Sequence, residues 1–455
     1  MRLNFEKSLF FTLIFIIIFI LTYNILHYTP LLGYDAEAHI NYVDHLSRYL
    51  PKEIDLPSDE ETREFFNPPL AYLVPSLVQV ICRNTIESYD FLADCRPIYA
   101  KVTQIFQSIL YLLTIFFNLL LLKKFNHQKS IINVGYLLLV SLLAANYRTI
   151  SMIRGEPYIL FFLSLFLLLF FECSKNKFIF DKKYVIAFGI TIGLIGLSRQ
   201  WGFLLFPPLI ILGFFKLVIY KKDYFKFVFS SLFIGFLVSS WFYINLFIQY
   251  GSFTAFNKER LPFSFFNKPL NFYIPDSESL YYLFYKPIRP HLNNQFITTL
   301  YSDLWGDYWG YFSFTSLYLD IGRNQILIGD YLANVNKISL LTTGIIIFLY
   351  FKSNRHFKES FLVRYVNLTV AFSFIGFLWF LLSYYESTGD TIKATYFIHV
   401  FHLIILMAAV YLQVLKNSNR KFYNLVLILL SIIFVLNFQT YLSHFPASFI
   451  ENYRI

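Results

Sequence analysis

Long apolar runs recur along the whole chain, and each is about as long as a helix that crosses a membrane. A bilayer core requires about 20 mostly apolar residues per helix. Only 15% of the residues are charged, and 57% are hydrophobic. An average soluble domain carries about 25% charged residues, so this chain cannot cover a water-facing surface. The pattern excludes a soluble enzyme, a disordered tail and a coiled coil, and it predicts an all-α polytopic membrane protein.

We count about eleven expected transmembrane helices, using the length that a bilayer requires. The fifth is short enough to be tilted or partly re-entrant. The expected spans cover residues 9–26, 104–122, 131–147, 157–171, 184–198, 203–220, 227–248, 338–351, 361–384, 396–415 and 422–441.

Lysine and arginine gather in alternate connections between these spans. The positive-inside rule places those connections, and the N-terminus, in the cytoplasm. That side holds only five of the 28 acidic residues, so the others are expected to face outward. The net charge of +10 therefore reflects topology and attraction to anionic membrane lipid. It does not indicate a nucleic acid as a partner.

Two outward segments, 27–103 and 251–337, are too long to be simple connectors. Loops beyond about 12–15 residues are usually functional or carry structure of their own, so we expect juxtamembrane helices in both. The chain then has three parts. These are an N-terminal transmembrane module, 1–250, which includes the first outer loop, the large extracytoplasmic loop 251–337, and C-terminal transmembrane helices, 338–455.

An amphipathic helix is expected after Gly33, at the membrane surface. Asp35 and His39, four residues apart, share one face at its start. One interpretation is that Asp35 is an N-cap, since Asp before a helical run is a preferred cap. The other is that Asp35 is a general base that Glu37 or His39 orients, or with which they share a metal.

The stretch 67–72, NPPLAY, lies later in the same segment. Paired prolines suit the first turn of a helix, where no backbone donor is needed. The apolar run that follows is short and broken by Pro75, which favours an interfacial or re-entrant helix over a span.

The stretch 34–39, YDAEAH, followed by 67–72, NPPLAY, resembles the GT-C superfamily of membrane glycosyltransferases. The resemblance, to protein O-mannosyltransferase-like and aminoarabinose-transferase-like members, implies a polyprenyl-phosphate-linked sugar as donor and a catalytic acid in the first outer loop. It implies a glycan, lipid or protein acceptor, and we expect a bacterial plasma membrane rather than the endoplasmic reticulum. Many members carry two adjacent acids where this chain has Asp35-Ala36-Glu37. Either acid can therefore be the catalytic one, and we favour Asp35.

Glu156 precedes Pro157 at the expected start of the fourth span. A carboxylate there would be stabilised by the helix dipole, with Arg154 as a candidate ion-pair partner. The resemblance implies instead a second acidic position, at which Glu156 binds the acceptor or a metal beside Asp35.

A leaving phosphate needs cations near the outer membrane surface. Arg199 ends the fifth span beside a Trp, and Lys393 lies at the outer start of the tenth span. Several GT-C relatives have a similar basic residue near an aromatic at the position of Lys393. The alternative for each residue is a cation that snorkels to a lipid headgroup. We favour Arg199 over Lys393.

Trp305, Asp307 and Trp309 lie close together in the second outer segment. Rings that stack on sugar faces and acids that hold hydroxyl groups would form a sugar-binding site. The same rings would also suit an interfacial aromatic belt.

Cys82 and Cys95 share the first outer loop. Outer compartments permit disulfides, so this pair is a disulfide candidate, and two unpaired thiols are the alternative. No zinc-binding spacing and no nucleotide-binding glycine pattern is present. A Mg²⁺ or Mn²⁺ ion between Asp35, His39 and Glu156 is an option that the sequence does not require.

The reaction expected from these features is inverting transfer of a hexose or pentose to an acceptor hydroxyl on the extracytoplasmic face. Asp35 would take the proton and stabilise an oxocarbenium-like transition state. The alternative is a multi-pass lipid or solute transporter or flippase without glycosyl transfer, which would need ionisable or helix-breaking sites near the bilayer midplane. In a third class, an assembly or scaffold subunit without catalytic activity, Asp35 and Glu156 would lie far apart.

Overall fold

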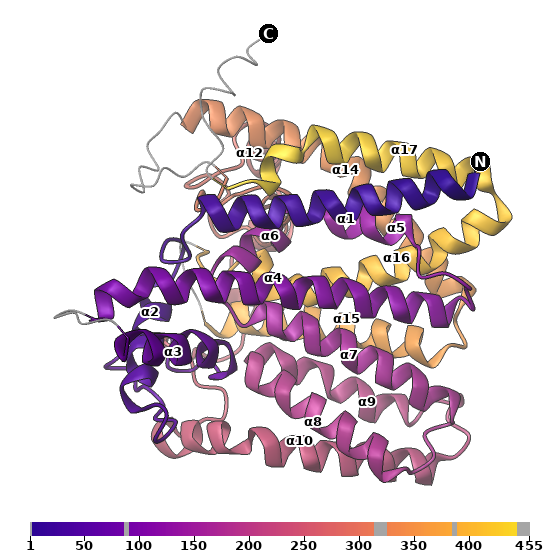
Figure 1. The fold of residues 1–455 in the computed structure, drawn as a ribbon. Helices are drawn as coiled ribbons and strands as arrows, with labels where there is room; N and C mark the ends of the chain where they lie inside the picture. Colours follow the sequence, from indigo (N-terminus) through magenta and orange to yellow (C-terminus); the bar gives the residue numbers. More distant parts are fainter. Residues whose placement is uncertain (1, 86–90, 314–324, 385–388, 444–455) are drawn as a thin grey trace.

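The computed structural model describes residues 2–85, 91–313, 325–384 and 389–443. These residues form α-helices and short 3₁₀ helices, and none of them is in a strand (Figure 1). The helices are α1 (Arg2–His27), α2 (Ala36–Tyr49), α3 (Leu70–Arg83), α4 (Phe91–Phe125), α5 (Val134–Ser141), α6 (Ala144–Ser151), α7 (Glu156–Lys175), α8 (Lys182–Ser198), η1 (Gln200–Leu205), α9 (Pro207–Leu212), α10 (Lys221–Tyr250), η2 (Phe265–Asn267), α11 (Leu270–Tyr273), α12 (Ser277–Tyr285), α13 (Phe296–Trp305), α14 (Gln325–His356), α15 (Phe361–Ser383), η3 (Ala394–Phe397), α16 (Ile398–Ser418), α17 (Arg420–Leu436) and η4 (Phe438–Tyr441).

The long helices form one bundle. In the described part of the chain, seven helices are long and apolar enough to cross a membrane, or eight if the bent pair α5 and α6 counts as one span. The N-terminus lies at one end of the bundle, and α2 and α3 lie at the opposite end, which we call the α2–α3 end (Figure 1). The chain is therefore an integral, multi-pass membrane protein, as predicted.

The other expected spans are shorter or broken. α8 and α17 have 17 residues each, and α5 meets α6 at an angle of 67°. The apolar run 203–220 is divided between η1 and α9, which has six residues and begins at Pro207 and Pro208. Because proline lacks a backbone donor and clashes with the preceding turn, this run cannot continue as one helix. The described residues therefore contain fewer full-length spans than the eleven expected.

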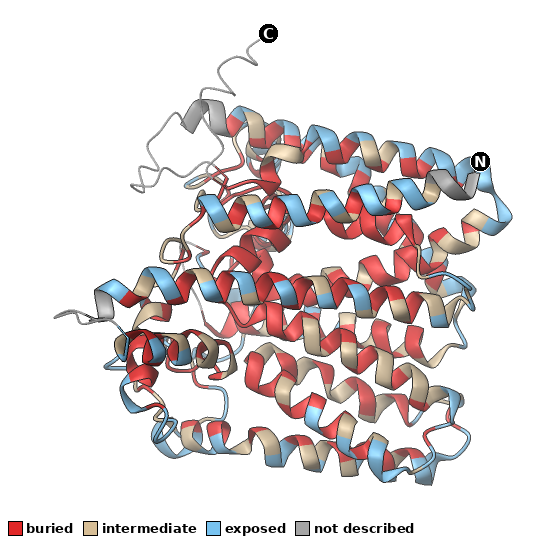
Figure 2. Cartoon of the chain, in the orientation of Figure 1, coloured by how far each residue is buried: buried red, intermediate tan, exposed pale blue. Residues whose placement is uncertain are grey.

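Buried residues lie along the helices at the centre of the bundle, and many exposed residues lie on the outer helices (Figure 2). Every residue of α5 is buried, as are most residues of α16. On the outside, Phe15 of α1, Phe233 of α10 and Val435 of α17 are exposed. Exposed apolar faces of this extent are unfavourable in water, whereas lipid solvates them, so they agree with a membrane location.

Glycines bring α8 and α10 into close contact. A Cβ atom at Gly193 would lie 2.5 Å from Cβ of Val238, and one at Gly235 would lie 2.5 Å from Cγ2 of Ile192. Small residues at such positions let membrane helices approach closely. This packing fixes the end of α8, after which Arg199 follows directly.

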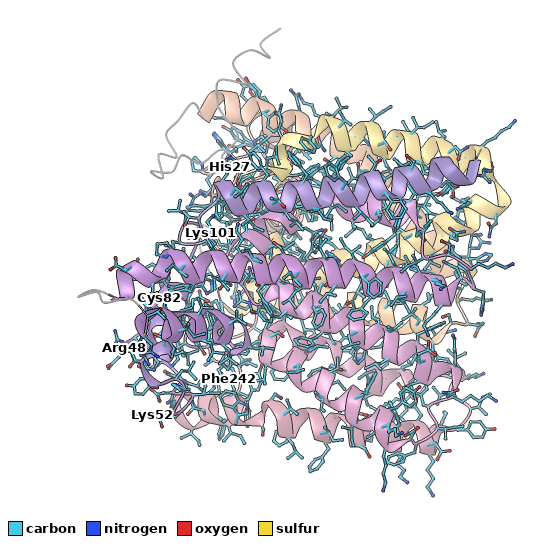
Figure 3. The ribbon with its side chains drawn as sticks, viewed as in Figure 1. His27, Arg48, Lys52, Cys82, Lys101 and Phe242 are labelled. Atoms are coloured by element: carbon cyan, nitrogen blue, oxygen red, sulfur yellow. A yellow bond between two sulfur atoms is a disulfide. The ribbon has the colours of Figure 1, made fainter. Side chains whose placement is uncertain are left out.

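The α2–α3 end is held together by rings and by a disulfide. The rings of Tyr42 on α2 and Tyr72 on α3 stack with centroids 3.9 Å apart. Cys82 on α3 and Cys95 on α4 form a disulfide, which confirms the predicted pairing. Figure 3 shows Cys82 at this end of the bundle, near the exposed Arg48. The helix expected after the paired prolines is α3, and that prediction is confirmed as well.

Replacing Cys82 and Cys95 together by Ser is expected to destabilise this end by about 3 kcal/mol, because a disulfide of this loop length restricts the unfolded chain. Hydrogen exchange in lipid nanodiscs checks the result, since amides of α3 should exchange faster while those of α8 keep their rates. Cys173→Ala, which removes the buried free cysteine of α7, is the control. Unchanged exchange in α3 of the double variant would contradict the prediction.

Candidate active site

Asp35 lies directly before α2, at the N-cap position, but it does not cap the helix. Its backbone is left-handed, with φ of 62°, and its side chain makes no cap hydrogen bond. Few residues other than glycine adopt this region, and Asp is among those that tolerate it. The carboxylate contacts cations from distant parts of the chain instead. Asp35 is therefore the N-cap residue by position, as one interpretation of the sequence held, but its side chain does not cap the helix.

Three cations surround the Asp35 carboxylate. Lys393 Nζ donates a hydrogen bond to Oδ2 at 2.5 Å, and the exposed Arg63 donates from Nη2 to Oδ1 at 3.3 Å. Arg154 Nη2 lies 3.9 Å from Oδ2, and it also donates to the backbone carbonyl of Tyr34. Lys393 and Arg154 are buried. Lys393 is thus an ion-pair partner of Asp35, and the snorkelling interpretation is wrong for it.

These charges set the protonation states of the ion pair. Burial alone would raise the pKa of the Asp35 carboxyl, but Lys393 and Arg154 outweigh burial and hold this pKa well below its usual range. Burial would lower the pKa of the Lys393 ammonium, yet the Asp35 carboxylate raises it above its usual value. Each partner therefore favours the charged form of the other, and Asp35 remains a carboxylate at neutral pH.

Arg199 follows the last residue of α8 and is buried. Its Nε donates to Glu156 Oε1 at 2.9 Å, and its Nη1 donates to Asn67 Oδ1. Glu64 Oε2 lies 4.0 Å from Nη1. Nη2 is buried and has no hydrogen-bond partner among the described residues. The snorkelling interpretation is therefore wrong for Arg199 too.

Glu156 begins α7 and is followed by Pro157, as the sequence predicts. Its ion-pair partner is Arg199 rather than Arg154. Burial lowers the pKa of the Arg154 guanidinium, but the neighbouring Tyr34, Asp35 and Glu156 outweigh burial and raise this pKa. One guanidinium therefore links the two acids electrostatically, and the structure does not leave them in unrelated parts of the molecule.

His39 does not orient Asp35. Its Nδ1 pairs with the Tyr72 hydroxyl at 2.7 Å. Burial, together with Arg154 and Arg199, lowers the pKa of His39 well below its usual value, so the ring is neutral. His39 thus belongs to the contact between α2 and α3.

Glu64 is a second buried acid near Asp35, and it accepts a hydrogen bond from Asn67 Nδ2. Burial raises the pKa of its carboxyl, and the nearby Asp35 carboxylate raises it further. The pKa of the Asp35 carboxyl is thus lowered, whereas the pKa of the Glu64 carboxyl is raised.

The Asp35 carboxylate borders a cavity of about 430 Å³, which we call the charged cavity. This volume lies within the range of small-molecule sites. Glu37, which is exposed on α2, lines the same cavity. The charged residues around it are Asp35, Glu37, Arg63, Arg289, Asp390 and Lys393, and the rings are Tyr34, Trp309 and Tyr311.

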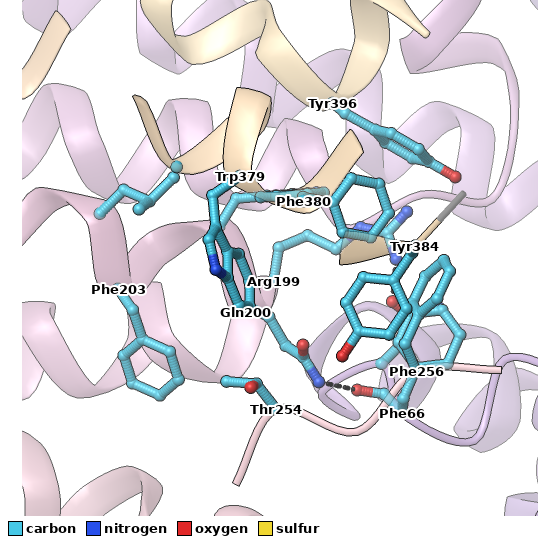
Figure 4. A pocket seen from close by; sticks show the side chains of 14 residues that line it. Phe66, Arg199, Gln200, Phe203, Thr254, Phe256, Trp379, Phe380, Tyr384 and Tyr396 are labelled. Atoms are coloured by element: carbon cyan, nitrogen blue, oxygen red, sulfur yellow. Dashed lines mark hydrogen bonds between the residues drawn. The ribbon is translucent and has the colours of Figure 1, made fainter. Parts of the chain in front are cut away.

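A second pocket, of about 140 Å³, is lined by Arg199 and by rings (Figure 4). We call it the aromatic pocket. Its rings are Phe66, Trp201, Phe203, Phe256, Trp379, Phe380, Tyr384 and Tyr396. The Tyr396 ring lies 5.6 Å from the Arg199 guanidinium carbon and 5.6 Å from Lys393 Nζ. Tyr396 therefore links a cation of the aromatic pocket with a cation of the charged cavity.

Only one residue of the expected sugar-binding set in the second outer segment lines the charged cavity. Trp309 lines it, whereas Trp305 is buried in the hydrophobic core. Asp307 is buried as well. Its Oδ2 accepts hydrogen bonds from the backbone N–H groups of Phe312 and Ser313 at 2.9 and 2.8 Å. Trp309 and Asp35 thus line the same cavity. Trp305 packs in the core, and Asp307 holds its own loop.

Asp35, His39 and Glu156 do not come together as ligands of a Mg²⁺ or Mn²⁺ ion. Within the described ranges, no group of three His, Cys, Asp or Glu side chains is placed to hold a metal ion. His39 faces Tyr72, Glu156 faces Arg199, and Asp35 is surrounded by cations that would repel a metal ion. We assign no metal to these residues.

Sequence reasoning did not find Arg63, Glu64, Arg289 or Asp390. The first two lie in the polar stretch between α2 and α3, which has no helical periodicity. The other two lie in loops that carry charges like many other outward residues. Asn67 lies within the NPPLAY stretch, but the motif did not indicate its contact with Arg199.

No family model matches the chain, and no curated protein is similar to it. Two solved structures of the oligosaccharyltransferase from the archaeon Archaeoglobus fulgidus match over 97% of this chain at 14% identity, with TM-scores of 0.51 and 0.52. One is tethered to an acceptor peptide, and the other is in complex with an inhibitory peptide and a dolichol-phosphate. The chain has the GT-C fold. It spans 56% and 57% of the length of those two chains.

The GT-C fold confirms, at the level of architecture, the resemblance carried by the stretches YDAEAH and NPPLAY. The oligosaccharyltransferase chains extend well beyond the region that this GT-C chain matches. The likeness therefore concerns the fold, and the activity of this chain depends on its own cavity, pocket and charges.

Proposed function

We propose that this GT-C protein is a glycosyltransferase that moves a sugar from a polyprenyl-phosphate donor to an acceptor hydroxyl, with inversion and with Asp35 as the general base. We also propose that the α2–α3 end faces the extracytoplasmic side and that the N-terminus is cytoplasmic. One observation carries the proposal. An ionised carboxylate, held by Lys393 and Arg63, borders a cavity of about 430 Å³ at the α2–α3 end of the bundle.

The aromatic pocket suits the lipid part of the donor. Its rings offer apolar contacts to a prenyl chain, and Arg199 and Gln200 lie among them (Figure 4). The free Nη2 of Arg199 can donate to a phosphate oxygen, for which a guanidinium is well suited. Glu156 then positions Arg199 and does not contact the substrate itself.

The charged cavity suits the acceptor. Asp35 Oδ can accept a hydrogen bond from the attacking hydroxyl and then take its proton. A donor phosphate held at Arg199 would also come near Lys393, which faces the same Tyr396 ring, and would compete with Asp35 for the charge of Lys393. This competition raises the pKa of Asp35 and makes it a better base. Glu37, which lines the same cavity, is the other acid that could serve.

Inversion agrees with the two separate sites. The lipid phosphate would leave on the side of Arg199, and the acceptor would attack from the side of Asp35. Lys393 and Tyr396 lie between these sides. Because a lipid phosphate is a good leaving group, the reaction needs no separate acid.

Transfer is tested with the purified chain in lipid nanodiscs and a panel of undecaprenyl-phosphate-linked hexoses and pentoses. The acceptors are simple glycosides, a serine-containing peptide and a lipid with a free hydroxyl. We expect release of undecaprenyl phosphate with at least one donor, and NMR of the product should show an anomeric configuration opposite to that of the donor. Retention would contradict Asp35 as a simple base. Movement of undecaprenyl phosphate across vesicles without any transfer would support a flippase instead.

A further inference from the structure

Arg289 is a cation of the charged cavity that has no acidic partner in the described ranges. It lines the cavity together with Asp35 and Glu37, and no ion pair to it occurs among the described residues. Its Nε is buried and has no hydrogen-bond partner in that part of the chain. Buried donors are nearly always bonded, so a free one that lines a cavity indicates a ligand.

Two rings hold the Arg289 side chain in place. Its guanidinium carbon lies 4.9 Å from the Tyr311 ring centroid and 5.5 Å from the Trp309 ring centroid. Both rings line the same cavity. Cation–π contacts of this kind engage the face of the guanidinium and leave the N–H groups at its edge free. A guanidinium fixed in this way loses less conformational freedom when it binds a ligand.

The other cations of the cavity are already paired. Lys393 and Arg63 both donate to the Asp35 carboxylate. Arg289 is therefore the cavity cation whose charge is still available to a ligand, within the described part of the chain. The exposed acids Glu37 and Asp390 can accept hydrogen bonds from the hydroxyl groups of the same ligand.

We propose that Arg289 binds a carboxylate or phosphate group on the acceptor, so that the enzyme selects an acidic sugar as acceptor. The inference rests on the proposed function. The paired N–H donors of a guanidinium match the two oxygens of such a group. The anion belongs to the acceptor because the donor's own phosphate is placed at Arg199, beside the aromatic pocket. An acidic sugar would present its hydroxyl to Asp35 and its anionic group to Arg289.

Binding tests this inference without requiring transfer. The probes are methyl β-glucuronide, methyl β-glucoside and glucose 6-phosphate, and their affinity for the full chain in nanodiscs is measured by saturation-transfer NMR. We expect the glucuronide to bind at least about tenfold more tightly than the glucoside, as one charge-assisted bidentate contact would give. The relative affinity of glucose 6-phosphate distinguishes a phosphate preference from a carboxylate preference.

Three variants assign the preference to Arg289. Arg289→Gln should reduce it to about twofold or less, and Arg289→Lys, which keeps the charge but not the paired donors, should retain part of it. Arg48→Gln, at an exposed residue on α2 outside the cavity, should keep it in full. The inference is overturned if neither the glucuronide nor glucose 6-phosphate binds the wild type more tightly than the glucoside, or if Arg289→Gln keeps the preference. A chain that showed the preference but transferred no sugar would contradict the proposed function alone.

Discussion

Asp35→Asn is expected to lower kcat for sugar transfer about a thousandfold, which lies within the range for loss of a general base. Asn has nearly the same size as Asp and can still accept a hydrogen bond from Lys393, but it cannot take a proton from the acceptor hydroxyl. The rate is measured in single-turnover reactions with a donor from the undecaprenyl-phosphate panel. Asp35→Glu keeps the charge beside Lys393 but moves the carboxylate by one methylene, and we expect an intermediate rate.

Asp59→Asn is the matched control for this prediction. Asp59 is an exposed acid of the same segment, and its carboxylate accepts a hydrogen bond from the Tyr250 hydroxyl at 3.3 Å. This variant should transfer at the normal rate. If Asp35→Asn also did so, Asp35 would not be the base, and Glu37→Gln would become the variant that identifies it.

Arg199→Gln is expected to lower the free energy of unfolding by about 3–5 kcal/mol, the cost of removing one partner of a buried ion pair. The variant leaves the buried Glu156 carboxylate without the guanidinium that lies 2.9 Å away. Transfer should also fall below detection, because the donor phosphate loses its guanidinium. Chemical unfolding in nanodiscs measures the first effect, and the transfer assay measures the second.

The double variant Arg199→Gln with Glu156→Gln separates these two effects. Two neutral amides can hydrogen-bond to each other, so most of the lost stability should return, since a buried ion pair replaced as a unit often costs little. Transfer should stay lost. If the double variant regained transfer, Arg199 would serve folding only, and the placement of the donor phosphate would be wrong.

The sequence predicts those parts of the fold that depend on local pattern. Apolar runs are enough to predict the long helices, and the paired prolines before Leu70 predict the start of α3. The run 203–220 predicts one membrane span because its mean hydropathy is high. That prediction is wrong, because Pro207 and Pro208 divide the run between η1 and α9. In this segment the backbone geometry of proline decides the structure, and apolar content does not.

The sequence predicts several residues of the candidate site, among them two acids and the cations Arg199 and Lys393, but it does not predict which of them pair. Asp35 and Glu156 stand out because each lies next to a helix start in a segment expected to face outward. Their partners could not be predicted, since nothing in the local sequence pairs Arg199 with Glu156 or turns His39 toward Tyr72. The same holds for Asp307, whose Oδ1 lies 3.7 Å from Nη1 of Arg148 on α6. These contacts are set by how distant helices pack.

The ion pair between Lys393 and Asp35 joins positions 358 residues apart. During translation, the first third of the protein is complete long before the ammonium that neutralises its carboxylate has left the ribosome. Until the last helices are inserted, the Asp35 carboxylate of a nascent chain can contact Arg63 and Arg154 but lacks its hydrogen bond from Lys393. A stop codon before residue 393 would remove the ammonium that lies 2.5 Å from the Asp35 carboxylate, so we expect a chain shortened there to lose this ion pair.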